Sequence, residues 1–188
     1  MRRQILFVQG GGGENVHDAW DSKLVESLEQ RLGPDFDILY PRMPNEDDPK
    51  FAPWKAAIRA ELDRLDDSAM LVGHSIGAAI LVHSLADESP ERALAGIFLV
   101  SMPFIGEGGW PSDEIEPQPD LGAKLPAGLP VYLYQGSADE TVPANHAELN
   151  AKAIPQAVVR MLSGRDHQLN NDMSDVAADI RDLLAAAG

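Results

Sequence analysis

The chain has 188 residues and a formal charge of −15 at pH 7, from 15 Lys and Arg against 30 Asp and Glu. Its length fits one domain, and a hydrophobic content of 44% is typical of a globular protein rather than a disordered one. The acidity argues against a nucleic-acid partner, because phosphates are bound by clustered Lys and Arg. Because the chain contains no cysteine, a disulfide framework, a thiolate nucleophile and a cysteine-ligated metal are excluded.

The beginning of the chain does not resemble a targeting segment. The apolar run at residues 5–8 ends at a glycine run, which makes it too short for a signal peptide. Elsewhere, too, no run approaches the ~20 apolar residues that cross a membrane. We therefore expect a cytoplasmic protein without membrane insertion.

Short strand-like runs alternate with longer helical patterns along the chain. This alternation is typical of βαβ units, so it predicts an α/β fold with a mostly parallel sheet and helices on both faces. We expect a single domain over residues 1–188. The predicted strands are 5–8, 36–39, 69–72, 96–101, 131–134 and 157–162, and the predicted helices are 20–32, 54–65, 77–86, one that opens at Pro143, and 176–184.

Prolines crowd two loops of the predicted fold. One follows the strand at 36–39, and the other spans residues 103–128, after the strand at 96–101. The second is far longer than the usual connection of roughly two to six residues, and long loops often carry function. We expect 103–128 to be either a plain surface excursion or a small lid.

A Gly-x-Ser-x-Gly motif at residues 73–77 stands between the predicted strand 69–72 and the helix after it. This strand–turn–helix context is the one that a nucleophile elbow requires. The turn is so tight that Ser75 must adopt strained backbone angles, and side chains at the flanking positions would collide with neighbouring elements. Glycines at Gly73 and Gly77 remove both clashes, so the motif predicts Ser75 as a nucleophile.

A serine hydroxyl is a poor nucleophile unless a histidine takes its proton and a carboxylate orients that histidine. In this architecture the order is Ser, then Asp or Glu, then His, each at the carboxyl end of a strand. Asp139 follows the predicted strand 131–134, and His167 follows the predicted strand 157–162. Order and topology therefore favour Asp139 as the acid and His167 as the base.

Other residues compete for these two roles. Glu140 is the neighbouring alternative for the acid, and Asp113 or Glu114 in the proline-rich loop is the remote one. Asp166 is adjacent to the base but points elsewhere if His167 faces the serine. The remaining histidines lie at positions that favour other roles: His17, His74, His83 and His146.

Negative charge that develops on a carbonyl oxygen must be met by preorganised N–H donors. We expect one from the backbone of Ile76 and the other from the glycine run 10–13, with Gly11 as first choice and Gly12 as the alternative. The run is not a dinucleotide fingerprint, because Asn15 stands where a glycine is needed. A P-loop and a His-Glu-x-x-His metal motif are also absent, so we expect neither cofactor nor metal.

Taken together, these features resemble the α/β-hydrolase fold superfamily, and within it the small serine hydrolases like retinoblastoma-binding protein nine. The resemblance implies a minimal three-layer α/β/α fold with a six-stranded sheet in the order 2-1-3-4-5-6, and it implies Ser75, Asp139 and His167 as the catalytic triad. It rests on the first glycine turn, His17 with Trp20, Met43-Pro44-Asn45 with Trp54, the motif at 73–77, and segments 139–143 and 164–172.

The leading hypothesis is a serine hydrolase that cleaves a small ester, thioester or amide through an acyl-enzyme, and carboxylesterase is the best single interpretation. The alternative is a binding or regulatory protein that keeps the fold with little turnover. The expected partner is a small acyl substrate, and the oligomeric state is left open. Five acidic residues in 103–128 favour neutral or cationic substrates over anionic ones such as acyl-CoA.

Overall fold

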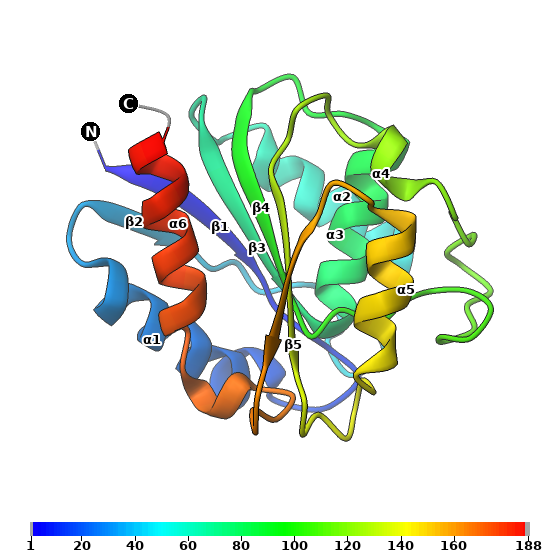
Figure 1. Cartoon of the computed structure of the whole chain (residues 1–188). Helices are drawn as coiled ribbons and strands as arrows, with labels where there is room; N and C mark the ends of the chain where they lie inside the picture. Colours follow the sequence, from blue (N-terminus) through cyan, green and yellow to red (C-terminus); the bar gives the residue numbers. More distant parts are fainter. Residues whose placement is uncertain (1, 187–188) are drawn as a thin grey trace.

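The computed structural model describes residues 2–186 and contains one sheet of 6 strands in the order β2-β1-β3-β4-β5-β6 (Figure 1). Each neighbouring pair is parallel, which confirms the predicted fold class and strand order. The strands are β1 (Arg3–Val8), β2 (Phe36–Leu39), β3 (Ala69–His74), β4 (Leu94–Val100), β5 (Val131–Gly136) and β6 (Val158–Leu162).

Helices cover both faces of the sheet and divide the core in two. On one face α1 (Ser22–Leu32) and α6 (Ser174–Ala186) pack against β1, β3 and β4. On the other face lie α2 (Phe51–Leu62), α3 (Ser75–Asp87), α5 (Asn145–Ala153) and the short α4 (Leu121–Lys124). The central helix α3 is apolar nearly all round. This pattern agrees with its position, because α3 packs against the sheet and is also in contact with α2 and α4.

Three short helical segments were not predicted from the periodicity. A π-helix, η1 (Val16–Asp21), precedes α1, and a 3₁₀-helix, η2 (Leu169–Asn171), precedes α6. The third is α4, inside the proline-rich segment. Helix α5 begins at Asn145 rather than at Pro143, because a tight turn comes first, in which the N–H of His146 donates to the carbonyl of Pro143 at 2.9 Å.

The proline-rich segment 103–128 is anchored to the core. Four of its apolar side chains are buried against α3 and its neighbours: Ile105, Ile115, Leu121 and Leu125. Because the strands are parallel, their carboxyl ends meet at one edge of the sheet, where this segment also passes. No helix in the described part of the chain is long and apolar enough to span a bilayer.

Candidate active site

The turn between β3 and α3 has the strained geometry that its motif predicts. Ser75 has a φ of 53°, in the left-handed region that side chains rarely adopt. A Cβ at Gly77 would lie 1.8 Å from the carbonyl oxygen of Gln9, and one at Gly73 would lie 2.7 Å from the Cα of Ala78. Both glycines are therefore required, because β1, β3 and α3 approach each other too closely for any side chain there.

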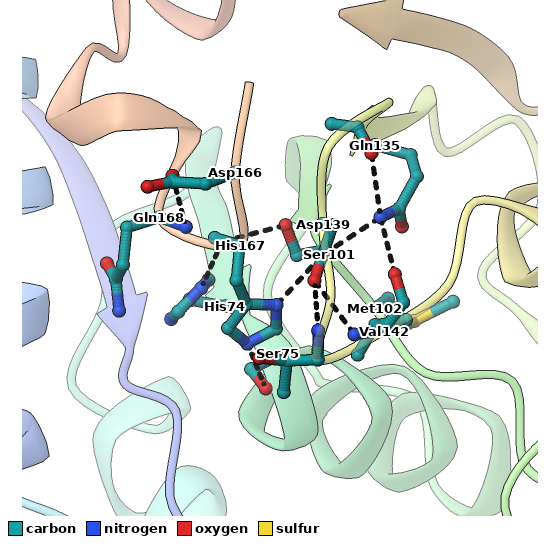
Figure 2. A network of polar contacts seen from close by, with 12 residues as sticks. His74, Ser75, Ser101, Met102, Gln135, Asp139, Val142, Asp166, His167 and Gln168 are labelled. Atoms are coloured by element: carbon teal, nitrogen blue, oxygen red, sulfur yellow. Dashed lines mark hydrogen bonds and ion pairs between the residues drawn. The ribbon is translucent and has the colours of Figure 1, made fainter. Parts of the chain in front are cut away.

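Ser75, His167 and Asp139 form a continuous chain of hydrogen bonds (Figure 2). The Oγ of Ser75 lies 3.0 Å from the Nε2 of His167. The Nδ1 of His167 lies 2.8 Å from the Oδ2 of Asp139. With the proton on Nδ1 donated to the carboxylate, Nε2 is free to accept the serine proton, which is the arrangement of a general base. The three residues come from the carboxyl ends of β3, β5 and β6.

Asp139 is held as a carboxylate by four donors. Its Oδ1 accepts the N–H groups of Thr141 and Val142 at 2.9 and 2.8 Å, and its Oδ2 accepts the amide of Gln135 at 2.9 Å besides His167. Burial raises the pKa of this carboxyl, but the bonds from His167 and the backbone outweigh burial, so the pKa lies below its ordinary value. The charge needed to orient an imidazolium is therefore present at neutral pH.

The competing acids lie away from this chain of bonds. Glu140 is exposed, and the carboxylate of Glu114 accepts the N–H of Phe51 at 2.7 Å. The carboxylate of Asp166 also points away from the serine, since its Oδ1 accepts the N–H groups of Gln168 and Asn170 at 3.0 and 2.7 Å. These bonds hold the turn that carries the base.

The glycine run 10–13 lines the pocket beside Ser75, and two of its N–H groups are already engaged within the protein. The N–H of Gly10 donates to Asp21 at 2.6 Å, and that of Gly12 donates to the carbonyl of Glu46 at 2.8 Å. Between them, the N–H of Gly11 has no acceptor among residues 2–186. Of the two alternatives, Gly11 is therefore the one whose N–H is left without a partner in the described chain. The N–H of Ile76 lies in the first turn of α3, where N–H groups lack intrahelical acceptors.

Gly11 must be a glycine because the loop after β2 encloses it. A Cβ there would lie 2.9 Å from the carbonyl oxygen of Glu46 and 3.0 Å from the ring of Trp54. The buried Gln9 links the same two loops, since its amide donates to Glu46 at 2.7 Å and its oxygen accepts the N–H of Met43 at 3.0 Å. The backbone around Gly11 is thus fixed before any substrate arrives.

Sequence reasoning missed three polar residues of the site. Gln135 at the end of β5 donates to Asp139, and Ser101 just past β4 donates to the carbonyl of His167 at 2.9 Å. Because both residues lie at the carboxyl ends of strands, the sequence could have indicated them as site residues. Asp21 resembles an ordinary helix cap in the sequence, but it makes no cap hydrogen bond and its carboxylate faces His74 at 2.9 Å.

A pocket of about 350 Å³ opens above Ser75. Its walls are mostly apolar and include Val16, Trp20, Ile76 and, from the proline-rich segment, Trp110. Trp20 is 52% exposed at the rim, whereas Trp54 is buried and belongs to the core. Within residues 2–186, no group of three or more acidic or histidine side chains is arranged to hold a metal ion.

Comparisons with known proteins agree with this fold. An esterase from Rhodococcus sp. ECU1013 has a TM-score of 0.75 at 16% identity, covering 100% of this chain and 92% of that one. The ydeN gene product from B. subtilis has a TM-score of 0.72 at 20% identity, covering 97% and 99%. A serine hydrolase without lid from Xanthomonas campestris gives 0.66 at 15% identity, covering 97% and 81%. No curated protein matches the chain significantly.

These similarities in structure, at low identity, show the α/β-hydrolase fold. The narrower resemblance to retinoblastoma-binding protein nine stays a prediction. A family model described as serine hydrolase matches residues 7–173, which is most of the chain. The protein therefore belongs to the serine hydrolase family, and it is a hydrolase.

Proposed function

We propose that the protein is an esterase for small, uncharged acyl esters and that Ser75, His167 and Asp139 are its catalytic triad. The observation that carries the proposal is the unbroken hydrogen-bond chain from the Oγ of Ser75 through His167 to a buried carboxylate, at the floor of an apolar pocket. Esters suit such a site because ester cleavage makes the smallest demands on the catalytic groups.

The geometry supports a two-step reaction. The Oγ of Ser75 attacks the acyl carbon while the Nε2 of His167 takes its proton, and Asp139 stabilises the resulting imidazolium. The N–H groups of Gly11 and Ile76 donate to the oxyanion. As the C–O bond breaks, His167 returns the proton to the leaving alcohol. Water then attacks the acyl-enzyme by the same route and releases the acid and free Ser75.

The pocket supports a small apolar acyl group. Its lining in the described chain contains no Lys or Arg that would pair with a carboxylate or phosphate on the substrate. Trp110 brings segment 103–128 into the wall, so we propose that this segment covers the acyl chain. Hydrolysis of a thioester or an amide would use the same triad. Only assays with the corresponding substrates distinguish these two activities from ester hydrolysis.

A panel of nitrophenyl esters of increasing acyl length tests the proposal. We expect turnover of short esters, a loss of kcat of about a millionfold, down to background, in Ser75→Ala, and a shift towards longer chains in Trp110→Ala. The Ser75→Ala variant should keep the unfolding midpoint of the parent, because it removes one hydroxyl and no core contact. Retained activity in Ser75→Ala would show that another nucleophile acts, and no turnover of any ester would favour the binding-protein alternative.

A further inference from the structure

A second histidine–carboxylate pair lies directly behind the candidate triad. The Nδ1 of His74 is 2.9 Å from the Oδ2 of Asp21, and both side chains are almost wholly buried. The two residues are 53 positions apart in the chain. The proton path proposed above runs from Ser75 to His167 and does not pass through this pair, so its role requires a separate explanation.

The pair contacts the main chain at two places in the site, at His167 and at Gly10. The Nε2 of His74 lies 3.1 Å from the carbonyl oxygen of His167, and Ser101 donates to the same oxygen (Figure 2). Asp21 accepts the N–H of Gly10, the residue before the proposed oxyanion donor. One buried unit thus holds the backbone of the base and the backbone of the oxyanion loop.

The contacts also determine the protonation state of the His74 ring. Its Nδ1 faces a carboxylate and its Nε2 faces a carbonyl oxygen, and both of these groups only accept hydrogen bonds. Both contacts are hydrogen bonds only if the ring carries a proton on each nitrogen. Burial alone lowers the pKa of His74, but the charge of Asp21 and the bonds to Asp21 and His167 outweigh burial, so the pKa lies above its ordinary value.

Charged and titratable groups around His74 come from η1 and from the loops that follow β5 and β6. Asp21 lies at the end of η1, and the ring of His167 lies 4.9 Å from that of His74, centroid to centroid. Asp139 acts on the ring through its charge. Gln168, adjacent to the base, completes the surroundings by donating its amide to the Oδ1 of Asp21 at 3.1 Å.

We propose that His74 and Asp21 are positioning residues, a buried imidazolium–carboxylate pair that holds the main chain of His167 and Gly10 so that base and oxyanion donor stay aligned on Ser75. The proposal rests on the proposed esterase function for its effect on rate, but the charged state of the pair is a property of the resting protein. A displacement of a base by about 1 Å is enough to lower a rate about a hundredfold.

The first test needs no substitution and no activity. In protein labelled with ¹⁵N-histidine at pH 7.5, His74, assigned by the resonances lost in His74→Asn, should show two protonated ring nitrogens. A neutral His74 ring would overturn the proposal even if the protein proves a good esterase. The protonation state of His74 can be measured even if the protein hydrolyses no ester. Failure of this proposal is therefore distinguishable from failure of the proposed esterase function.

The second test is kinetic. Asp21→Asn keeps the shape of the side chain and removes its charge, and we expect kcat to fall about tenfold to a hundredfold with little change in KM, because Asp21 does not line the pocket, although its partner His74 does. Asp179→Asn is the matched control. Asp179 is also a buried carboxylate with two partners, Tyr134 and Arg160, but it lies on α6. We expect that control to lose stability and to keep kcat.

The comparison separates positioning from folding. Asp21→Asn protein that unfolds at the same denaturant concentration as Asp179→Asn but retains the parent kcat would overturn the proposal. If Asp21→Asn does not fold, the state of the ring in the unsubstituted protein still decides the question.

Discussion

At the scale of single residues, Gly77 leaves no room for a side chain against the backbone of Gln9. The Cβ of an alanine at position 77 would lie 1.8 Å from a carbonyl oxygen, so β1 and α3 would have to separate. We expect Gly77→Ala to lower the free energy of unfolding by about 3 kcal/mol or more. Gly13→Ala is the control, because its nearest neighbour would be a side-chain carbon at 3.9 Å. Equal denaturant midpoints for the two variants would contradict the structure.

The same scale shows what the sequence could and could not predict. The convergence of Ser75, Asp139 and His167 was predictable because each follows its strand closely and strand ends converge in a parallel sheet. Asp21 was not, because its role depends on a contact with His74 across 53 residues, and locally it looks like a helix cap. The sequence favours Gly11 over Gly12 as the donor from the glycine run without a contact that decides between them, and the bond from the N–H of Gly12 to the carbonyl of Glu46 supplies that contact.

At the scale of elements, helix α3 carries a histidine that its apolar surroundings keep neutral. His83 is 4% exposed, and its Nδ1 has no partner among residues 2–186. Burial lowers its pKa from 6.5 to about 4. The unfolded chain therefore binds this proton more readily than the folded protein, so the group makes no difference above pH 6.5 and destabilises the fold progressively as the pH falls towards 4.

We expect His83→Leu to remove this part of the acid sensitivity. Between pH 7 and pH 4 the variant should lose roughly 3 kcal/mol less unfolding free energy than the parent. The difference between the two proteins isolates His83, because the other histidines and the carboxylates titrate in both. Urea titrations across this range measure it, and parallel pH profiles would contradict the neutral, buried state of the ring.

The alternation of strands and helices was readable in the sequence because buried strands and amphipathic helices have different periods. The short elements were not. The π-helix η1 begins after Asn15, which has a φ of 59°, and η2 contains three successive residues with positive φ, a local geometry with no periodic signature. The sequence predicts segment 103–128 as a loop, yet four of its apolar side chains are buried in the core. Deletion of the segment would therefore damage the fold, and Trp110→Ala is the cleaner probe.

At the scale of the whole molecule, the charge of −15 and the mostly apolar pocket act in the same direction. An anionic substrate meets repulsion on approach and finds no Lys or Arg in the pocket lining of the described chain. We expect kcat/KM for a neutral N-acetylcysteamine thioester to exceed that of the acyl-CoA with the same acyl group by about tenfold. The gap should narrow as added salt shortens the screening length.

The thioester pair keeps the reacting bond constant, so the comparison measures charge and size of the leaving group alone. A neutral pantetheine thioester controls for size. Acyl-CoA cleaved faster than both neutral thioesters would contradict this account of substrate class, while leaving the triad untouched.

Covalent labelling tests most directly whether Ser75 is a nucleophile activated by His167. A fluorophosphonate reacts with an activated serine and stays bound. Mass spectrometry of peptides from the folded protein should place one adduct on Ser75, with none after heat denaturation, none in Ser75→Ala and a much slower reaction in His167→Ala. Folded protein with His167 intact that leaves Ser75 unlabelled would contradict this role of Ser75.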